Sequence, residues 1–258
     1  PCIKADDECY NVEWSTELTV PKALEEYVKA WFLVHVMAVE YGLGSPDGMQ
    51  FNMSVGYDLA GIQTAKIDSF IENLKDASHT AIFAECKAWL LAHLDRFQKL
   101  RREDVEAIPA EICNSVTVST MHGCPPDEVE RIALHFLQGR RLNTTLKMNP
   151  TLLGPERVRG ILNESLGYTV NVPDIAFEHD ISYDTALRIL HSCRHAADEL
   201  GLAFGVKLTN TLEALNSGRS LPEKEPMVYM SGRALYPVSI AVARRLQDDF
   251  EGRLDISL

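Results

Sequence analysis

The sequence reads TTLKMNPT at residues 144–151 and AFGVKLTNT at residues 203–211, and these two stretches decide the fold class. Each is short and apolar, lies between helical segments, and has the composition of a buried β-strand. Each also carries a lysine, Lys147 or Lys207, that is followed by Asn and Thr. A lysine at the end of a buried strand is costly unless it meets an anion or becomes a neutral, reactive amine. We therefore expect the two strand ends to share one pocket.

Helical and strand-like segments alternate around these stretches. We expect helices over residues 21–41, 65–77, 81–100, 126–137, 155–166, 183–200 and 236–250. We expect strands over residues 50–55, 115–119, 144–149, 175–177, 203–209, 227–230 and 254–258. Repeated β–α units predict a parallel sheet, and polar groups at most of the strand ends favour a TIM (β/α)8 barrel over an open sheet. A barrel needs eight strands, so we expect an incomplete barrel with terminal strands missing from this chain.

Composition and charge limit the class of protein. With 258 residues, 46% of them hydrophobic, the chain can form one domain with a full core, and we expect residues 1–258 to be that domain. The net charge of −12 argues against a nucleic-acid surface. The N-terminus has no secretory signal, and the uncharged run within residues 21–41 is too short to cross a bilayer. The six cysteines form no CxxC pair and no zinc-ligand spacing, so we expect a cytoplasmic protein with reduced thiols.

Cys124 is the first candidate for chemistry. It lies before Pro125–Pro126 and an acid-rich first helical turn, where the helix N-terminus lowers a thiol pKa and the carboxylates raise it. It is either a proton donor or a nucleophile, with His122 as a possible assistant. The alternative is a small buried thiol beside a turn.

Lys147 and Lys207 each have two chemical interpretations. Such a lysine can stabilise the negative charge that gathers at the N1–C2 carbonyl edge of a flavin. It can also form a Schiff base if burial depresses its pKa. The alternative is a structural ion pair with Glu178 or Asp180.

Polar residues at other strand ends complete the candidate site. Asn149, Asn210 and Thr211 can hold the amide-like edge of a flat heterocycle, or they can satisfy backbone groups of a turn. The string MSGRALYP at residues 230–237 can bring backbone N–H groups to a phosphate or a flavin, or it is a plain helix start capped by Ser231. Residues 178–180, with His122, match no specific metal motif, and we expect no metal. The polar residues 213–226 form a lid or a surface loop.

Several long strings resemble the family labelled selenate reductase subunits. They are DECYNVEWSTEL at 7–18, FNMSVGYDLAGI at 51–62, STMHGCPPDEVERI at 119–132, KMNPTLLG at 147–154, FGVKLTNT at 204–211 and VYMSGRALYP at 228–237. The similarity covers essentially the whole chain. That family in turn resembles dihydropyrimidine dehydrogenase and dihydroorotate dehydrogenase, so the resemblance implies a flavin-type TIM barrel within a larger, multidomain oxidoreductase.

The resemblance also implies roles for individual residues. Cys124 matches a loop cysteine that donates a proton, and Lys147 matches a lysine that contacts the flavin, although a register shifted by one β–α unit would give that role to Lys207. Asn149, Asn210 and Thr211 are then substrate-binding residues. We assign catalysis to Cys124, Lys147 and Lys207.

The implied cofactor of the barrel is FMN, contacted by Ser54, Lys147, Ser231, Gly232 and Arg233. FAD, NAD(P)H and 4Fe-4S clusters belong to other domains of the parent protein, which are the expected redox partners. In the family a Gly-Gly pair after the next strand cradles the flavin phosphate. Because this chain stops at Leu258, before that position, we expect the chain alone to bind FMN poorly or not at all.

Three functions follow from these assignments. The first is a flavin-dependent oxidoreductase that passes hydride to or from a small, unsaturated heterocycle or a related electron acceptor. The second is a non-redox barrel enzyme, either a Schiff-base lyase or a metal hydrolase. The third is a catalytically inactive barrel that docks redox partners.

Overall fold

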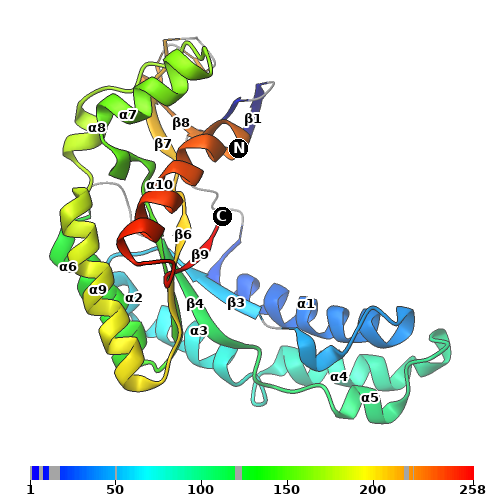
Figure 1. The fold of residues 1–258 in the computed structure, drawn as a ribbon. Coiled ribbons are helices and arrows are strands. Elements are labelled where there is room, and N and C mark those ends of the chain that lie inside the picture. The colour runs from blue at the N-terminus through cyan, green and yellow to red at the C-terminus, as the bar shows by residue number, and fades with distance from the viewer. Residues whose placement is uncertain are drawn as a thin grey trace. The chain divides into compact units, whose positions relative to one another are not determined.

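The computed structural model describes residues 2–5, 8–11, 18–49, 51–119, 124–217, 221–222 and 224–258. The chain divides into two compact units. One unit comprises residues 16–53 and 60–116 and is mainly helical; the other comprises residues 1–15, 54–59 and 117–258 and contains most of the strands (Figure 1).

The helical unit is built on α1 (Val20–Tyr41), which packs against α3 (Ala65–Lys75) and α4 (Ala81–Ala92). Gly42 ends α1 in the left-handed conformation, with φ of 65°, which confirms it as the C-cap. The helix predicted to reach residue 100 is shorter. It ends at Ala92 because the N–H of His93 bonds to the carbonyl of Leu90, which tightens the chain toward a 3-10 turn. The other short elements are η1 (Pro46–Gly48), α2 (Leu59–Ile62), η2 (Leu94–Arg96) and α5 (Arg102–Glu106).

A five-stranded sheet confirms most of the predicted strands. Its order is β3 (Phe51–Val55), β4 (Cys113–Ser119), β5 (Asn143–Met148), β6 (Phe204–Leu208), β9 (Asp255–Ser257). The last three strands are parallel, as the repeated β–α units predicted. The boundary between the two units falls within β3 and β4, whose C-terminal residues belong to the same unit as β5, β6 and β9.

The parallel strands have one apolar and one polar face. In β5 and β6, Leu146, Met148, Val206 and Leu208 are buried, and the side chains between them alternate to the other face. Helices α9 (Tyr183–Leu200) and α10 (Tyr236–Asp249) pack on β6. Barrel interiors are usually filled by bulky branched side chains. A face that instead presents lysine and threonine is suited to a ligand.

A second, antiparallel sheet was not predicted. Its order is β1 (Cys2–Ala5), β2 (Glu8–Asn11), β8 (Met227–Ser231), β7 (Leu212–Leu215). The expectation that residues 227–230 form a strand of the parallel sheet is wrong, because Met230 pairs with Tyr10 and Leu212 on antiparallel neighbours. The loop expected at residues 213–226 is shorter than predicted, because its first residues belong to β7. This pairing joins segments far apart in sequence, which no local pattern reveals.

The strand predicted at residues 175–177 is also wrong. These residues form α8 (Ile175–Glu178), whose first turn is closed by N–H groups of Ala176 and Phe177 bonding to the carbonyls of Pro173 and Asp174. A short apolar run does not distinguish helix from strand, so the sequence pattern alone could not exclude a helix here. Residues 178–180 therefore lie at the end of a helix rather than at the end of a strand.

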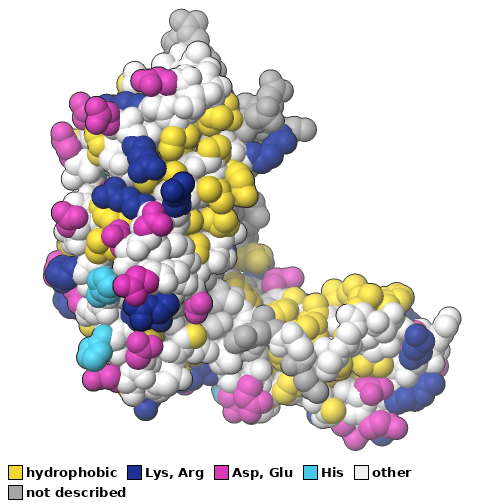
Figure 2. All heavy atoms as spheres, viewed as in Figure 1, with side chains coloured by type: hydrophobic (Ala, Val, Ile, Leu, Met, Phe, Trp, Pro, Cys, Tyr) yellow, Lys and Arg dark blue, Asp and Glu magenta, His cyan; other side chains and the backbone are white. Residues whose placement is uncertain are grey.

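The remaining helices are α6 (Pro126–Leu134), η3 (His135–Gly139), η4 (Pro150–Leu153), α7 (Pro155–Arg159), η5 (Gly160–Ser165) and η6 (Gly232–Leu235). They contact one another and other elements, and of them η3 packs on β5. Figure 1 shows α6 and α9 packed side by side. Acidic and basic side chains are interspersed over the face shown in Figure 2. Among the described residues, no helix is long and apolar enough to cross a membrane.

Candidate active site

A hollow of about 460 Å³ brings together most of the predicted site residues. It is bordered by the C-terminal ends of β5 and β6, by the end of β8 and by the start of α10. The predicted residues that line it are Lys147, Lys207, Asn210, Thr211, Ser231, Gly232 and Arg233. The expectation that the two lysine-bearing strand ends share a pocket is confirmed.

A second, much smaller hollow adjoins the same lysine. It is lined by Cys124, Lys147, Asn149 and Asp180, and its volume is about 10 Å³. That is the room for roughly one water molecule. The larger hollow is therefore the one with space for a cofactor or substrate, and Lys147 lines both.

Lys147 and Lys207 are register partners on the parallel strands β5 and β6. Lys147 is half-buried and Lys207 is exposed. Burial, and then the charge of Lys207, lower the pKa of Lys147 below its usual value of 10.5. Within the described part of the chain, neither lysine has a carboxylate partner at ion-pair distance, and Asp180 instead accepts a hydrogen bond of 2.6 Å from the Thr151 hydroxyl. The structural ion-pair interpretation therefore has no support.

Asn149 and Asn210 form a buried amide pair. The Nδ2 of Asn210 donates to the Oδ1 of Asn149 over 2.7 Å, and the backbone N–H of Asn210 donates to the Met148 carbonyl over 2.8 Å. Asn149 lines the small hollow and Asn210 the large one. The pair thus ties the ends of β5 and β6 together between the two hollows, so the two amides orient each other.

Cys124 lies just before α6 and is half-buried. Burial, followed by the carboxylates of Glu128, Asp127 and Asp58, raises the pKa of its thiol to about 11. Burial is thus the larger cause, and the nearby carboxylates raise the thiol pKa as the sequence predicted. A thiol with this pKa stays protonated at neutral pH, which suits a proton donor better than a nucleophile. His122, its expected assistant, lies outside the described residues.

Ser231, Gly232 and Arg233 lie where β8 passes through η6 into α10. Gly232 has φ of 71°, a conformation that favours glycine. Ser231 makes no side-chain capping bond at the start of η6, so the interpretation as a plain capped helix start is not supported. Ser54, the remaining predicted cofactor contact, is exposed on β3 and lines neither hollow.

Comparisons with known proteins identify the family and the class of fold. The model of the family described as "Oxidoreductase YgfK, N-terminal TIM-barrel domain" matches residues 1–258. The chain belongs to this family. The barrel class expected from the sequence is thereby confirmed, and the five-stranded sheet with β5, β6 and β9 parallel is consistent with part of such a barrel.

Two curated relatives of the YgfK family carry the name "Putative oxidoreductase YgfK", one from Escherichia coli strain K12 and one from E. coli O157:H7. Each is 46% identical over 270 residues, and the match covers 100% of this chain and 26% of the relative. The chain thus spans about a quarter of their length. These descriptions name an oxidoreductase and not a selenate reductase. No solved structure matches the chain.

Further residues of this YgfK-family chain line the large hollow without having been predicted. They include Tyr236 and Ser239. The hydroxyls of Thr209 and Ser239 are 3.3 Å apart, which joins the end of β6 to α10. Tyr236 lies in the MSGRALYP string at residues 230–237, so its position in the hollow with Arg233 could have been predicted from the sequence. Ser239 lies within α10, and only the packing of α10 on β6 brings it to the site.

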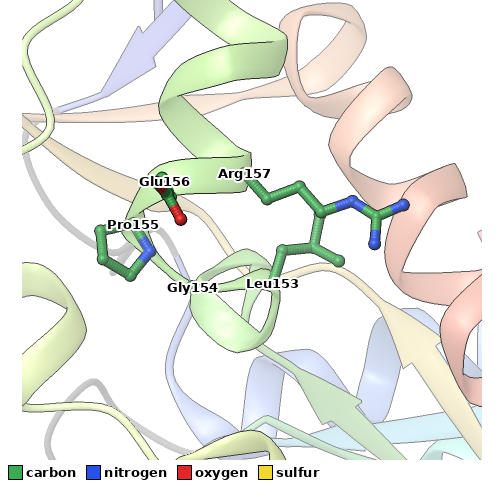
Figure 3. A pocket seen from close by; sticks show the side chains of 5 residues that line it. All are labelled: Leu153, Gly154, Pro155, Glu156 and Arg157. Atoms are coloured by element: carbon green, nitrogen blue, oxygen red, sulfur yellow. The ribbon is translucent and has the colours of Figure 1, made fainter.

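A third hollow, of about 470 Å³, lies at the start of α7. Figure 3 shows that the side chains of Leu153 and Arg157 project to one side of this segment and that of Pro155 to the other. Its polar groups do not converge on one point, and none of the predicted site residues lines it.

No group of three or more His, Cys, Asp and Glu side chains suited to a metal occurs among the described residues. Glu178, the last residue of α8, and His179, which follows it, are both exposed. Because His122 is outside the described part, the mixed His and carboxylate site considered from the sequence is not assembled by the residues that are described.

Proposed function

We propose that this chain is a flavin-dependent oxidoreductase barrel that holds FMN in the large hollow and acts on a small, unsaturated ring or a related electron acceptor. The observation that carries the proposal is the pair of neighbouring lysines, Lys147 and Lys207, that line the same hollow without a carboxylate partner among the described residues. Two such ammonium groups favour an anionic ligand.

The residues of the hollow fit the cofactor in volume and charge. A volume of about 460 Å³ is within the range of ligand pockets, roughly 300–1,000 Å³. The lining includes the cations Lys147, Lys207 and Arg233, and none of its described side chains is acidic. FMN carries a phosphate, and negative charge gathers on its ring system upon reduction, so a cationic hollow suits both parts.

Each part of the site has a distinct role in this proposal. A bound flavin supplies hydride transfer. Lys147, the more buried lysine, stabilises negative charge on the ring system, while Arg233 and the backbone at Gly232 hold the phosphate. The Asn149–Asn210 pair and Thr211 orient the substrate, and Cys124 holds the transferable proton on its Sγ.

We infer that the complete protein contains further redox domains. The curated relatives are nearly four times as long as the segment that matches this chain, since the match covers 26% of them. Domains that bind FAD, NAD(P)H and 4Fe-4S clusters would supply or accept the electrons. None of the residues of the hollow points to selenate as the acceptor.

A direct test is to titrate FMN into the chain, and into the longer protein that contains it, while following flavin fluorescence. We expect saturable quenching that weakens about tenfold or more in Lys147→Met, as the loss of a charge-assisted contact would predict. Lys22→Met, which removes an exposed lysine at the start of α1, is the matched control and should leave binding unchanged. A well-folded, colourless protein of full length that ignores FMN would contradict the proposal.

One observation favours a second candidate function. A lysine of lowered pKa beside another cation is the arrangement that activates Schiff-base lysines. In that case a carbonyl substrate, trapped with borohydride, would label Lys147 irreversibly. Labelling that persists in Lys207→Met at the same rate would show that the neighbouring charge has no part in activation.

A further inference from the structure

The helical unit contains a small hollow of its own, between α1 and residues 100–109. Its volume is about 140 Å³, and it is lined by His35, Asp104 and apolar side chains that include Val39, Leu100 and Ile108. It has room for several water molecules or one compact organic molecule.

The segment on the far side of this hollow is fastened to α1 at two points that flank His35. The indole N–H of Trp31 donates to the Pro109 carbonyl over 2.8 Å. The carboxylate of Glu40 accepts hydrogen bonds from the backbone N–H groups of residues 98–100, at 2.7, 2.9 and 3.0 Å. Hydrogen bonds therefore connect α1 to residues 98–109 on both sides of His35.

His35 itself is left with an unused nitrogen. Its side chain is 4% exposed. Its Nδ1 lies 2.8 Å from the Trp31 carbonyl, and because a carbonyl only accepts, Nδ1 must be the donor. In the neutral ring the other nitrogen, Nε2, is then an acceptor, and within the described residues it is buried without a hydrogen-bond partner. A buried polar atom without a hydrogen-bond partner is costly, so it points to a missing donor.

The second polar side chain of the hollow is also an acceptor. One oxygen of the Asp104 carboxylate accepts the backbone N–H of Arg101 over 2.8 Å, and the group carries a negative charge at neutral pH. The described side chains thus offer a hydrogen-bond acceptor, a negative charge and apolar walls. A ligand that complements all three has N–H donors, a positive charge and a short aliphatic body.

We propose that this hollow binds a short primary alkylamine in its ammonium form. The ammonium group donates to Nε2 of His35 and is balanced by Asp104, and the alkyl chain packs against Val39, Leu100 and Ile108. This site belongs to the helical unit and is independent of the flavin proposal.

The test uses n-butylammonium as the probe, with n-butanol and butyrate as molecules of similar size that lack the positive charge. Trp31 reports binding, because its ring centroid is 4.3 Å from that of His35. The fluorescence is measured in a protein that carries Trp14→Phe and Trp89→Phe, so that Trp31 is the only tryptophan. A parallel NMR titration follows the ring nitrogens of His35 directly.

We expect saturable changes at Trp31 and His35 with butylammonium, binding about tenfold weaker for butanol, and none for butyrate. Asp104→Asn keeps an oxygen for the Arg101 N–H and should weaken butylammonium binding about tenfold. The matched control Asp95→Asn, at an exposed acid of the same unit, should have no effect. Equal responses to all three probes, an unchanged affinity in Asp104→Asn, or no saturable response because the hollow holds water alone would each overturn the proposal.

Discussion

Lys147 and Lys207 are register partners on adjacent parallel strands, so two ammonium groups project from the same face of the sheet. This placement destabilises the folded protein unless an anion binds between the two ammonium groups, because neighbouring like charges repel. A bound anionic ligand would offset this repulsion, so the position of the two lysines on the sheet is connected to ligand binding. Sites of this kind commonly trade stability for function.

Removal of Lys147 should therefore stabilise the ligand-free protein. Burial disfavours the charged form, so the folded pKa of Lys147 lies below its usual value of 10.5 and the unfolded chain binds more protons. The destabilisation from the buried charge of Lys147 is fully present below its pKa in the folded state. It disappears as the pH rises to 10.5, so the free energy of unfolding increases with pH between these two values. We expect Lys147→Met to gain about 0.5–2 kcal/mol in urea unfolding at neutral pH, with a smaller gain near pH 10.5.

The partner lysine provides the control for this effect. In Lys207→Met the pKa of Lys147, followed by NMR of its side chain, should rise but stay below its usual value, because burial is the larger of its two causes. Lys22→Met should leave that pKa unchanged. A Lys147 pKa that is insensitive to Lys207 would show that the two ammonium groups do not interact.

Cys124 should resist alkylation at neutral pH. Its thiol pKa of about 11 leaves very little thiolate at pH 7, so iodoacetamide labelling, quantified by mass spectrometry, should be far slower than for a free thiol and should accelerate as the pH approaches 11. Glu128→Gln removes the largest charge contribution while keeping an oxygen for the Leu59 N–H, and should speed the reaction. Rapid labelling at pH 7 would instead identify Cys124 as a nucleophile.

The sequence predicts those helices and strands whose positions are determined by residues close together in the chain. Helix α9 is fixed by local chemistry, since Ser182 caps its start and Gly201 ends it with φ of 65°, and its predicted range is unchanged. The two strands that carry the lysines were likewise predicted correctly from their runs of apolar residues. Residues 175–177 were misassigned because a run of three apolar residues is too short to show a helix or strand period.

The antiparallel sheet was missed for a different reason. Tyr10, Leu212 and Met230 pair across large separations in sequence, and such pairing is determined by tertiary packing rather than by a local pattern. The same holds within the site. Asn149 and Asn210 were each predicted to touch substrate, but their bond to each other depends on the register of β5 and β6, which the sequence does not state.

Gly205 should be required for β9 to pair with β6. A Cβ at this position would lie 2.6 Å from the Asp255 carbonyl oxygen and 2.9 Å from the Asp255 Cβ, closer than real contacts allow. We expect Gly205→Ala to cost about 1–3 kcal/mol, the usual range for overpacking, and to speed hydrogen exchange of the amides of residues 255–257. Gly160→Ala, which meets only the end of the Glu164 side chain at 4.0 Å, is the control and should be neutral or stabilising. Unchanged exchange in β9 would mean that the strand adapts to the extra methyl group.

The Asn149–Asn210 pair should behave as a unit rather than as two independent contacts. Asn210→Leu leaves the buried Oδ1 of Asn149 without its donor, and Asn149→Leu leaves the Nδ2 of Asn210 without its acceptor. Each single change should cost about 1–3 kcal/mol in urea unfolding, whereas the double change removes both polar groups and should cost clearly less than the sum.

The control for this cycle combines Asn149→Leu with Asn163→Leu. Asn163 donates to the carbonyls of Tyr168 and Val170 and shares no hydrogen-bond partner with Asn149, so these two losses should add. If the pair also orients a ligand, the double Leu variant should regain stability without regaining FMN or substrate binding. Additive losses for Asn149 and Asn210 would show that the bond between them contributes little, and recovered binding would show that the pair has only a structural role.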